Sequence, residues 1–76
     1  MTSGLPDRKR RRLEQEMDSL EQQYKLASEK LNRLRQALAL EVDPSTKMKL
    51  EKQTEQAQTD LNQINEQLEQ VEQLLG

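Results

Sequence analysis

The sequence contains no cysteine, histidine, tryptophan or phenylalanine, and only one of its 76 residues is a tyrosine. Without cysteine the chain can form neither a disulfide nor a thiolate metal site, which fits a reducing compartment. Without histidine or cysteine it lacks common catalytic bases and nucleophiles, and it has no glycine-rich phosphate loop. We therefore predict a non-enzymatic protein that has no cofactor and no metal.

Long apolar runs are also missing. No stretch approaches the roughly 20 apolar residues that cross a bilayer, and no signal peptide is recognisable. Glu14, Glu16, Asp18 and Glu21 are candidate metal ligands, but they lack the Glu-x-x-His pattern of di-metal bundles, so we interpret them as a solvated face. We expect a cytoplasmic protein with no membrane span and no small-molecule substrate.

What the sequence does contain is a seven-residue apolar repeat on each side of Pro44. Steps of four and three residues are typical of the a and d positions of a coiled coil. If the chain folds back at Pro44, the two series pair in reverse order, from Leu38 with Leu50 to Leu13 with Leu75. The upstream series is Leu13, Met17, Leu20, Tyr24, Ala27, Leu31, Leu34 and Leu38, and the downstream series is Leu50, Thr54, Ala57, Leu61, Ile64, Leu68, Val71 and Leu75.

Asp43 and Pro44 predict the turn between the two series. An aspartate can accept hydrogen bonds from the free amides of the next helical turn, and proline suits the first helical position because its nitrogen has no proton. Proline also keeps the residue before it out of the helical region. We therefore predict a flexible tail over residues 1–6 and one hairpin over 7–76, with a helix at 7–41, a turn at 42–44 and a helix at 45–75.

The predicted fold is all-α, an antiparallel two-helix coiled-coil hairpin. A lone hairpin buries only one stripe of each helix, so we expect it to assemble into a four-helix bundle or larger oligomer, or to dock on another helical protein. Apolar residues outside the seam are the candidates for that contact. The predicted partner-binding residues on this face are Leu26, Ala37, Leu40, Met48 and Leu74.

The run Arg8, Lys9, Arg10, Arg11 and Arg12 is the strongest local charge signal. We interpret it as a basic helix end that pairs with Glu66, Glu69 and Glu72 of the second helix or with a partner chain. The register also predicts Arg35 near Glu51. Binding to nucleic acid or an anionic surface is the alternative for the basic run, although no aromatic residues alternate with the cations to stack on bases.

Residues 36–53, QALALEVDPSTKMKLEKQ, follow a pattern of Ala-Leu, two residues, an acid, one residue, Asp-Pro, two residues, Lys, one residue, Lys-Leu, two residues and Gln. This pattern resembles short helical-hairpin modules of bacteria, especially cyanobacteria, of the kind called effector-associated adaptor domains in conflict systems. Such modules stand beside NACHT-type or other STAND NTPases, caspase-like proteases, TIR or CHAT domains. Met48 stands where an aromatic residue is expected, and the basic run is not part of the pattern.

The resemblance implies a homotypic or heterotypic docking module that links a sensor NTPase to an effector in bacterial signalling or defence. The partner would be a second copy or a matching hairpin on another protein. Besides nucleic-acid or anionic-surface binding, a passive coiled-coil spacer in a larger chain is the other alternative function.

Overall fold

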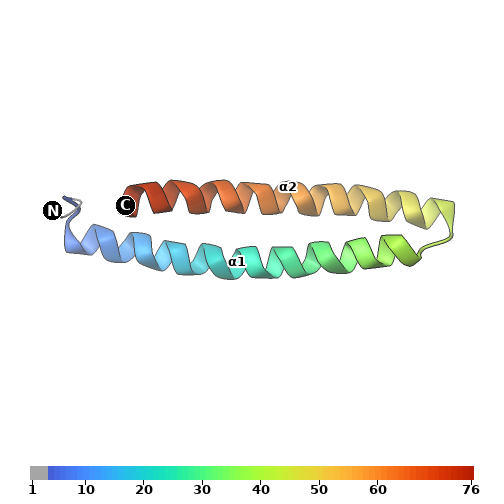
Figure 1. Ribbon diagram of the computed structural model, residues 1–76, viewed down its shortest axis with the longest axis horizontal. Helices are drawn as coiled ribbons and strands as arrows, with labels where there is room; N and C mark the ends of the chain where they lie inside the picture. The colour runs from blue at the N-terminus through green and yellow to red at the C-terminus, as the bar shows by residue number, and fades with distance from the viewer. Residues whose placement is uncertain (1–3) are drawn as a thin grey trace.

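The computed structural model describes residues 4–76 as two antiparallel helices joined by a short turn (Figure 1). α1 spans Asp7–Leu40 and α2 spans Pro44–Leu75. The hairpin is a rod that measures 58 × 15 × 14 Å, with the start of α1 and the end of α2 at one end of the rod and the turn at the other. The predicted all-α antiparallel hairpin is confirmed.

The turn is held by a cap at the start of α2. The Asp43 carboxylate accepts one hydrogen bond from the backbone N–H of Thr46 and one from its hydroxyl, both at 2.9 Å. These bonds favour the charged carboxylate and lower the pKa of Asp43. α1 ends at Leu40, one residue earlier than predicted, because Glu41 is already extended; Pro44 is the first residue of α2 rather than the last of the turn.

The apolar seam faces inward along the whole rod. Of its predicted members, all are buried or half-buried except Tyr24, which is 37% exposed. The buried ones are Leu13, Leu20, Leu31, Ala57 and Val71. Heptad spacing places these side chains on one stripe of each helix, and the two stripes bury each other.

The packing of the seam differs between its two halves. Toward the chain ends, Leu13, Leu20 and Val71 form a cluster of large side chains, against which Met17, Ile64, Leu68 and Leu75 pack. Toward the turn, a large residue meets a small one at two levels of the seam, where Leu31 lies opposite Ala57 and Leu34 opposite Thr54. We refer to these as the open half and the turn half.

Contacts beside the seam define two faces of the hairpin. On one face, Lys30 and Gln53 line the same hollow, together with the seam residues Leu34 and Ala57. On the other, the Arg35 guanidinium donates a hydrogen bond of 2.8 Å to the side-chain oxygen of Gln58. The structure thus gives Arg35 a partner on α2 other than the predicted Glu51. Along the rod, Arg35 lies between Glu51 and Gln58. Its side chain extends away from the turn and so contacts Gln58.

Part of the predicted tail is packed on the fold. Gly4 has a φ of +79°, a conformation that favours glycine, and the half-buried Leu5 that follows packs against the cluster in the open half. The rest of the tail prediction, residues 1–3, lies outside the described residues.

Candidate functional site

The predicted partner-binding leucines are exposed. Leu40 is 83% exposed, and Leu26, Met48, Leu74 and the smaller Ala37 are also accessible to solvent. Val42, which is 91% exposed at the turn, was not among the predicted residues. It lay outside both heptad series, so no periodic pattern marked it.

These residues do not form one continuous patch. Ala37 and Leu74 occupy the same heptad position as Lys30 and Gln53, and therefore lie on the side of the hairpin that carries the hollow. Leu26 and Leu40 lie on the adjoining position of α1. Met48, in contrast, lies on the flank of α2 that faces the opposite way. The structure thus separates Met48 from the other four predicted residues.

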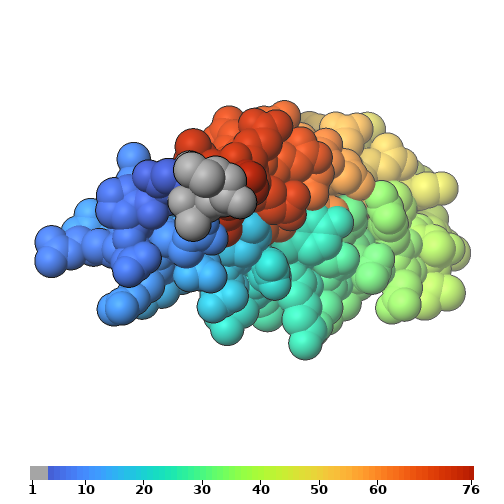
Figure 2. All heavy atoms as spheres, turned by 60° about the vertical axis from the view of Figure 1, so that its left-hand side comes forward, coloured from blue at the N-terminus to red at the C-terminus, as the bar shows by residue number. Residues whose placement is uncertain are grey.

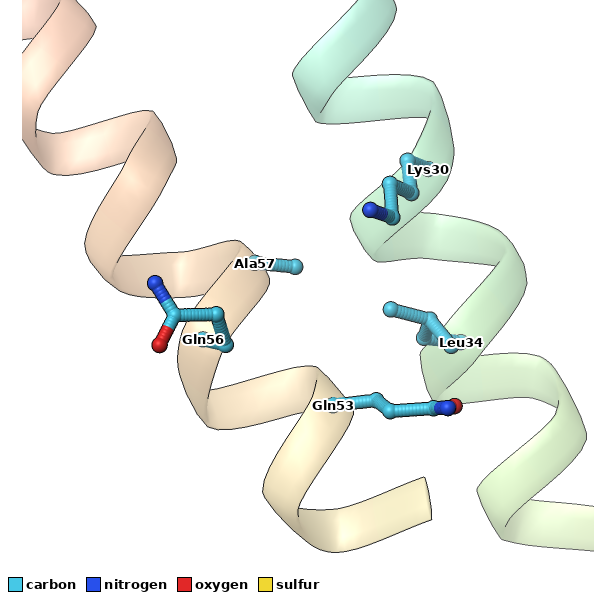
Figure 3. Close-up of a pocket in the computed structure, with 5 residues that line it drawn as sticks. All are labelled: Lys30, Leu34, Gln53, Gln56 and Ala57. Atoms are coloured by element: carbon cyan, nitrogen blue, oxygen red, sulfur yellow. The ribbon is translucent and has the colours of Figure 1, made fainter. Parts of the chain in front are cut away.

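We call the side that carries Leu26, Ala37, Leu40 and Leu74 the hollow face. Figure 3 shows how its hollow is built: Leu34 of α1 and Ala57 of α2 point toward each other, and Gln53 extends from α2 toward α1. The hollow has a volume of about 220 Å³. It exists because the short side chain of Ala57 does not fill the space beside Leu34.

A row of glutamines, which was not among the predicted partner-binding residues, also lies on the hollow face. These residues repeat with the spacing of the seam but one heptad position away from it, so they form a second, polar stripe along α2. The spacing was visible in the sequence. The exposed members of the row are Gln53, Gln56, Gln63, Gln67 and Gln70.

The basic run occupies the first turns of α1 at the open end. Figure 2 shows the side chains of this segment, in blue, standing out beyond α2, in red. Arg8, Lys9, Arg11 and Arg12 are exposed, and Arg10 is half-buried. Two shallow hollows of about 380 and 570 Å³ lie between these cations, the first lined by Arg8, Arg11 and Arg12 with Asp7 and Gln15.

For four of the five cations of the basic run, the predicted pairing with the acidic residues of α2 is not found among the described residues. No ion pair within residues 4–76 joins Arg8, Lys9, Arg11 or Arg12 to Glu66, Glu69 or Glu72. The register explains this result, because pairing Leu13 with Leu75 places residues 8–12 at and beyond the last residue of α2. Most of the cations are therefore too far along the rod to reach those carboxylates.

Pro6 precedes α1 and supplies no side-chain hydrogen bond to the helix. The unpaired amides of the first turn add positive potential to that of the arginines. The start of α1 therefore combines a run of cations with the positive end of a helix.

The acidic residues considered as metal ligands, Glu14, Glu16, Asp18 and Glu21, are all exposed. Among the described residues, no three aspartate or glutamate side chains gather closely enough to hold a metal ion. Neither α1 nor α2, as far as they are described, has an apolar stretch sufficient to cross a membrane.

The chain was compared with known protein families, with curated proteins and with solved structures, and one family matches it. The model of a family described as effector-associated domain 9 matches residues 3–71, which covers α1, the turn and α2 as far as Val71. Neither the curated proteins nor the solved structures include a match to this chain.

Proposed function

Because this match covers most of its length, the chain belongs to the effector-associated domain 9 family, and we propose that it is a non-enzymatic protein-interaction module. In this proposal the hairpin docks on a second copy or on a matching hairpin, and so links a sensor NTPase to an effector in bacterial signalling or defence. The family itself is an accessory domain of effector proteins.

The hollow face is the observation that carries this proposal. The seam is not available to a partner, because its leucines are already buried or half-buried against the other helix of the hairpin. Large apolar side chains nevertheless remain in solvent, above all Leu40 and Leu26 on the hollow face. Burying such a side chain contributes about 1.5–3 kcal/mol. A partner helix laid along this face would bury both leucines.

The test pairs this chain with a second hairpin of the effector-associated domain 9 family from the same cell, each purified and mixed. We expect an affinity in the micromolar range or tighter, for this pair or for the chain with itself, by calorimetry or sedimentation. Leu26→Glu with Leu40→Glu should abolish the association and leave the helical circular dichroism unchanged. Met48→Glu is the matched control on the opposite flank. Absence of both kinds of association would overturn the proposal.

The position of the basic run favours a second candidate, binding of an anionic polymer or surface. Four exposed cations lie at or past the end of α2 without ion-pair partners among the described residues. The affinity of such cations for phosphate groups falls steeply as the salt concentration rises. Retention on a phosphate matrix should fall as salt rises and should be lost when Arg8, Arg11 and Arg12 become Gln. Equal retention of the variant and the original chain would exclude this function.

A further inference from the structure

We propose that the hollow face pairs with the hollow face of a second copy, antiparallel, about a two-fold axis that passes near Leu26. This inference rests on the proposed function and names its partner as a second copy of this chain. The result is a four-helix bundle in which α1 of one copy lies along α1 of the other. Leu26 then meets its own counterpart, and Leu40 of each copy lies close to the level of Leu74 of the other.

The spacing of the exposed leucines along the rod carries the two-fold symmetry. An isologous interface requires one surface to be complementary to itself. Leu26 lies 14 residues from Leu40, which is about 21 Å along the helix. In the other direction, Leu74 lies at the level of Glu14 on α1, which is 12 residues or about 18 Å from Leu26. Because these two distances are nearly equal, a two-fold rotation about Leu26 brings Leu40 of each copy close to the level of Leu74 of the other.

Three charged residues of the hollow face, Glu16, Arg33 and Lys49, favour the antiparallel over the parallel arrangement. Under the proposed rotation, Glu16 of one copy falls between the levels of Arg33 and Lys49 of the other, within about one helical turn of each. In a parallel pair, Glu16 would instead share its level with Glu16, and Arg33 with Arg33. Like charges placed near each other disfavour association, whereas opposite charges select the partner and its orientation.

The glutamine row is compatible with a partner identical to itself. Gln63 lies at the level of Lys25, so the rotation about Leu26 also brings Gln63 close to its own counterpart. Its amide offers both hydrogen-bond donors and an acceptor, so one glutamine can bond to another without an unmatched charge. The opposite flank of α2 is different, because Glu51, Glu55 and Glu72 are exposed there. Two copies would repel each other through that flank.

The hollow face is large enough for a stable dimer. A rod of 58 by 15 Å has a side-on footprint on the order of 800 Å² for each copy, the usual area per partner in a specific complex. The hollow beside Ala57 lets a side chain of the second copy approach the seam. It lies between the levels of Leu26 and Leu40, within the proposed interface.

Single cysteines test the register directly, because the chain has none of its own. A disulfide requires Cα atoms within about 7 Å. In the proposed pair, Leu26→Cys lies near its counterpart, and Leu40 of one copy shares its level with Arg12 of the other. Two Leu40 positions are about 42 Å apart, as are two Arg12 positions. We expect oxidised Leu26→Cys to run as a covalent dimer on a non-reducing gel. Leu40→Cys and Arg12→Cys should each stay monomeric alone but cross-link when mixed.

Met48→Cys, on the opposite flank, is the matched control and should not cross-link. All four sites are exposed, so the variants should keep the original helical circular dichroism. Self-linking of Leu40→Cys would mean that the copies are parallel or that the two-fold axis lies near Leu40, and either result would overturn the inference. So would a sedimentation mass that stays monomeric up to millimolar concentration. A monomer that still binds another hairpin of the family would refute only this inference and leave the proposed function standing.

Discussion

The two halves of the hairpin follow one heptad pattern but pack differently. In the open half, Leu13, Leu20 and Val71 are buried together, and large side chains surround them. In the turn half, buried Leu31 lies at the level of buried Ala57, and Leu34 borders a hollow. The helices also begin differently: α2 has the Asp43 cap, and α1 has no side-chain cap.

Chain connectivity accounts for this difference. Near the turn, the two helices are held together by a connection of only three residues, Glu41 to Asp43, so bringing them into contact costs little loop entropy. Far from the turn, contact between the helices depends on side-chain packing. The open half therefore needs the larger apolar cluster, and the turn half tolerates alanine and threonine in the seam.

The largest expected effect follows from truncating the open-half cluster. Leu20→Ala should lower the free energy of unfolding by about 2–4 kcal/mol, because it leaves a cavity among large side chains. Leu38→Ala, in the half-buried seam near the turn, is the matched substitution and should cost about half as much. Urea unfolding followed by circular dichroism measures both. Equal losses would contradict the proposed division between the halves.

The cap at the turn should have the next largest effect. Asp43→Ala removes the acceptor for the Thr46 amide and hydroxyl, so the melting temperature at pH 7 should fall. Asp43→Asn keeps an acceptor oxygen and should lie between Asp43→Ala and the original chain. A melting temperature unchanged in Asp43→Ala would show that the connection alone maintains the turn.

The same cap predicts a pH dependence. The pKa of Asp43 is lowered in the folded chain by the hydrogen bonds from Thr46, below its ordinary value of 3.8. A group whose folded pKa is depressed stabilises the fold fully above the unfolded pKa, and this contribution is lost as the pH falls through the folded pKa. Melting of the original chain should therefore approach that of Asp43→Asn only in acid below pH 4. An unchanged difference there would argue against the bonded carboxylate.

A smaller effect is expected from Thr54, which interrupts the seam in the turn half. Its hydroxyl donates to the carbonyl of Leu50 at 2.7 Å, so it is satisfied locally and adds no contact with α1. Thr54→Val replaces the hydroxyl by a methyl group at the level of Leu34 and should stabilise the hairpin by about 0.5–1 kcal/mol. Thr59→Val, on the exposed surface of α2, is the control and should give no gain.

The smallest effect concerns the uncapped start of α1. Pro6→Asp supplies an acceptor for the free amides and an acid beside the basic run, so the hairpin should gain about 0.5 kcal/mol. Pro6→Ala offers no acceptor and serves as the control. Equal melting temperatures for the two variants would indicate that this end of α1 frays independently of the cap.

Much of the site could be read from the sequence, but its grouping could not. The exposure of Leu26, Leu40, Met48 and Leu74 was expected because none of them lies in the seam. They lie on different flanks because of the way each helix is rotated about its own axis relative to the other. Knowing only that a residue lies outside the seam does not give this rotation. The glutamine row and the position of the basic run beyond the end of α2 both follow from the predicted pairing of the two heptad series, although neither was predicted.

The sequence by itself determined two helices, their seam and the turn between them. These features are local or strictly periodic: Asp43 and Pro44 act on their immediate neighbours, and heptad spacing places leucines on one stripe of a helix whatever lies nearby. Only the tertiary structure decided that Arg35 bonds to Gln58, that Leu5 covers the open end and that a hollow lies beside Ala57. Each of these depends on the distance and rotation between the packed helices, to which side chains from both contribute.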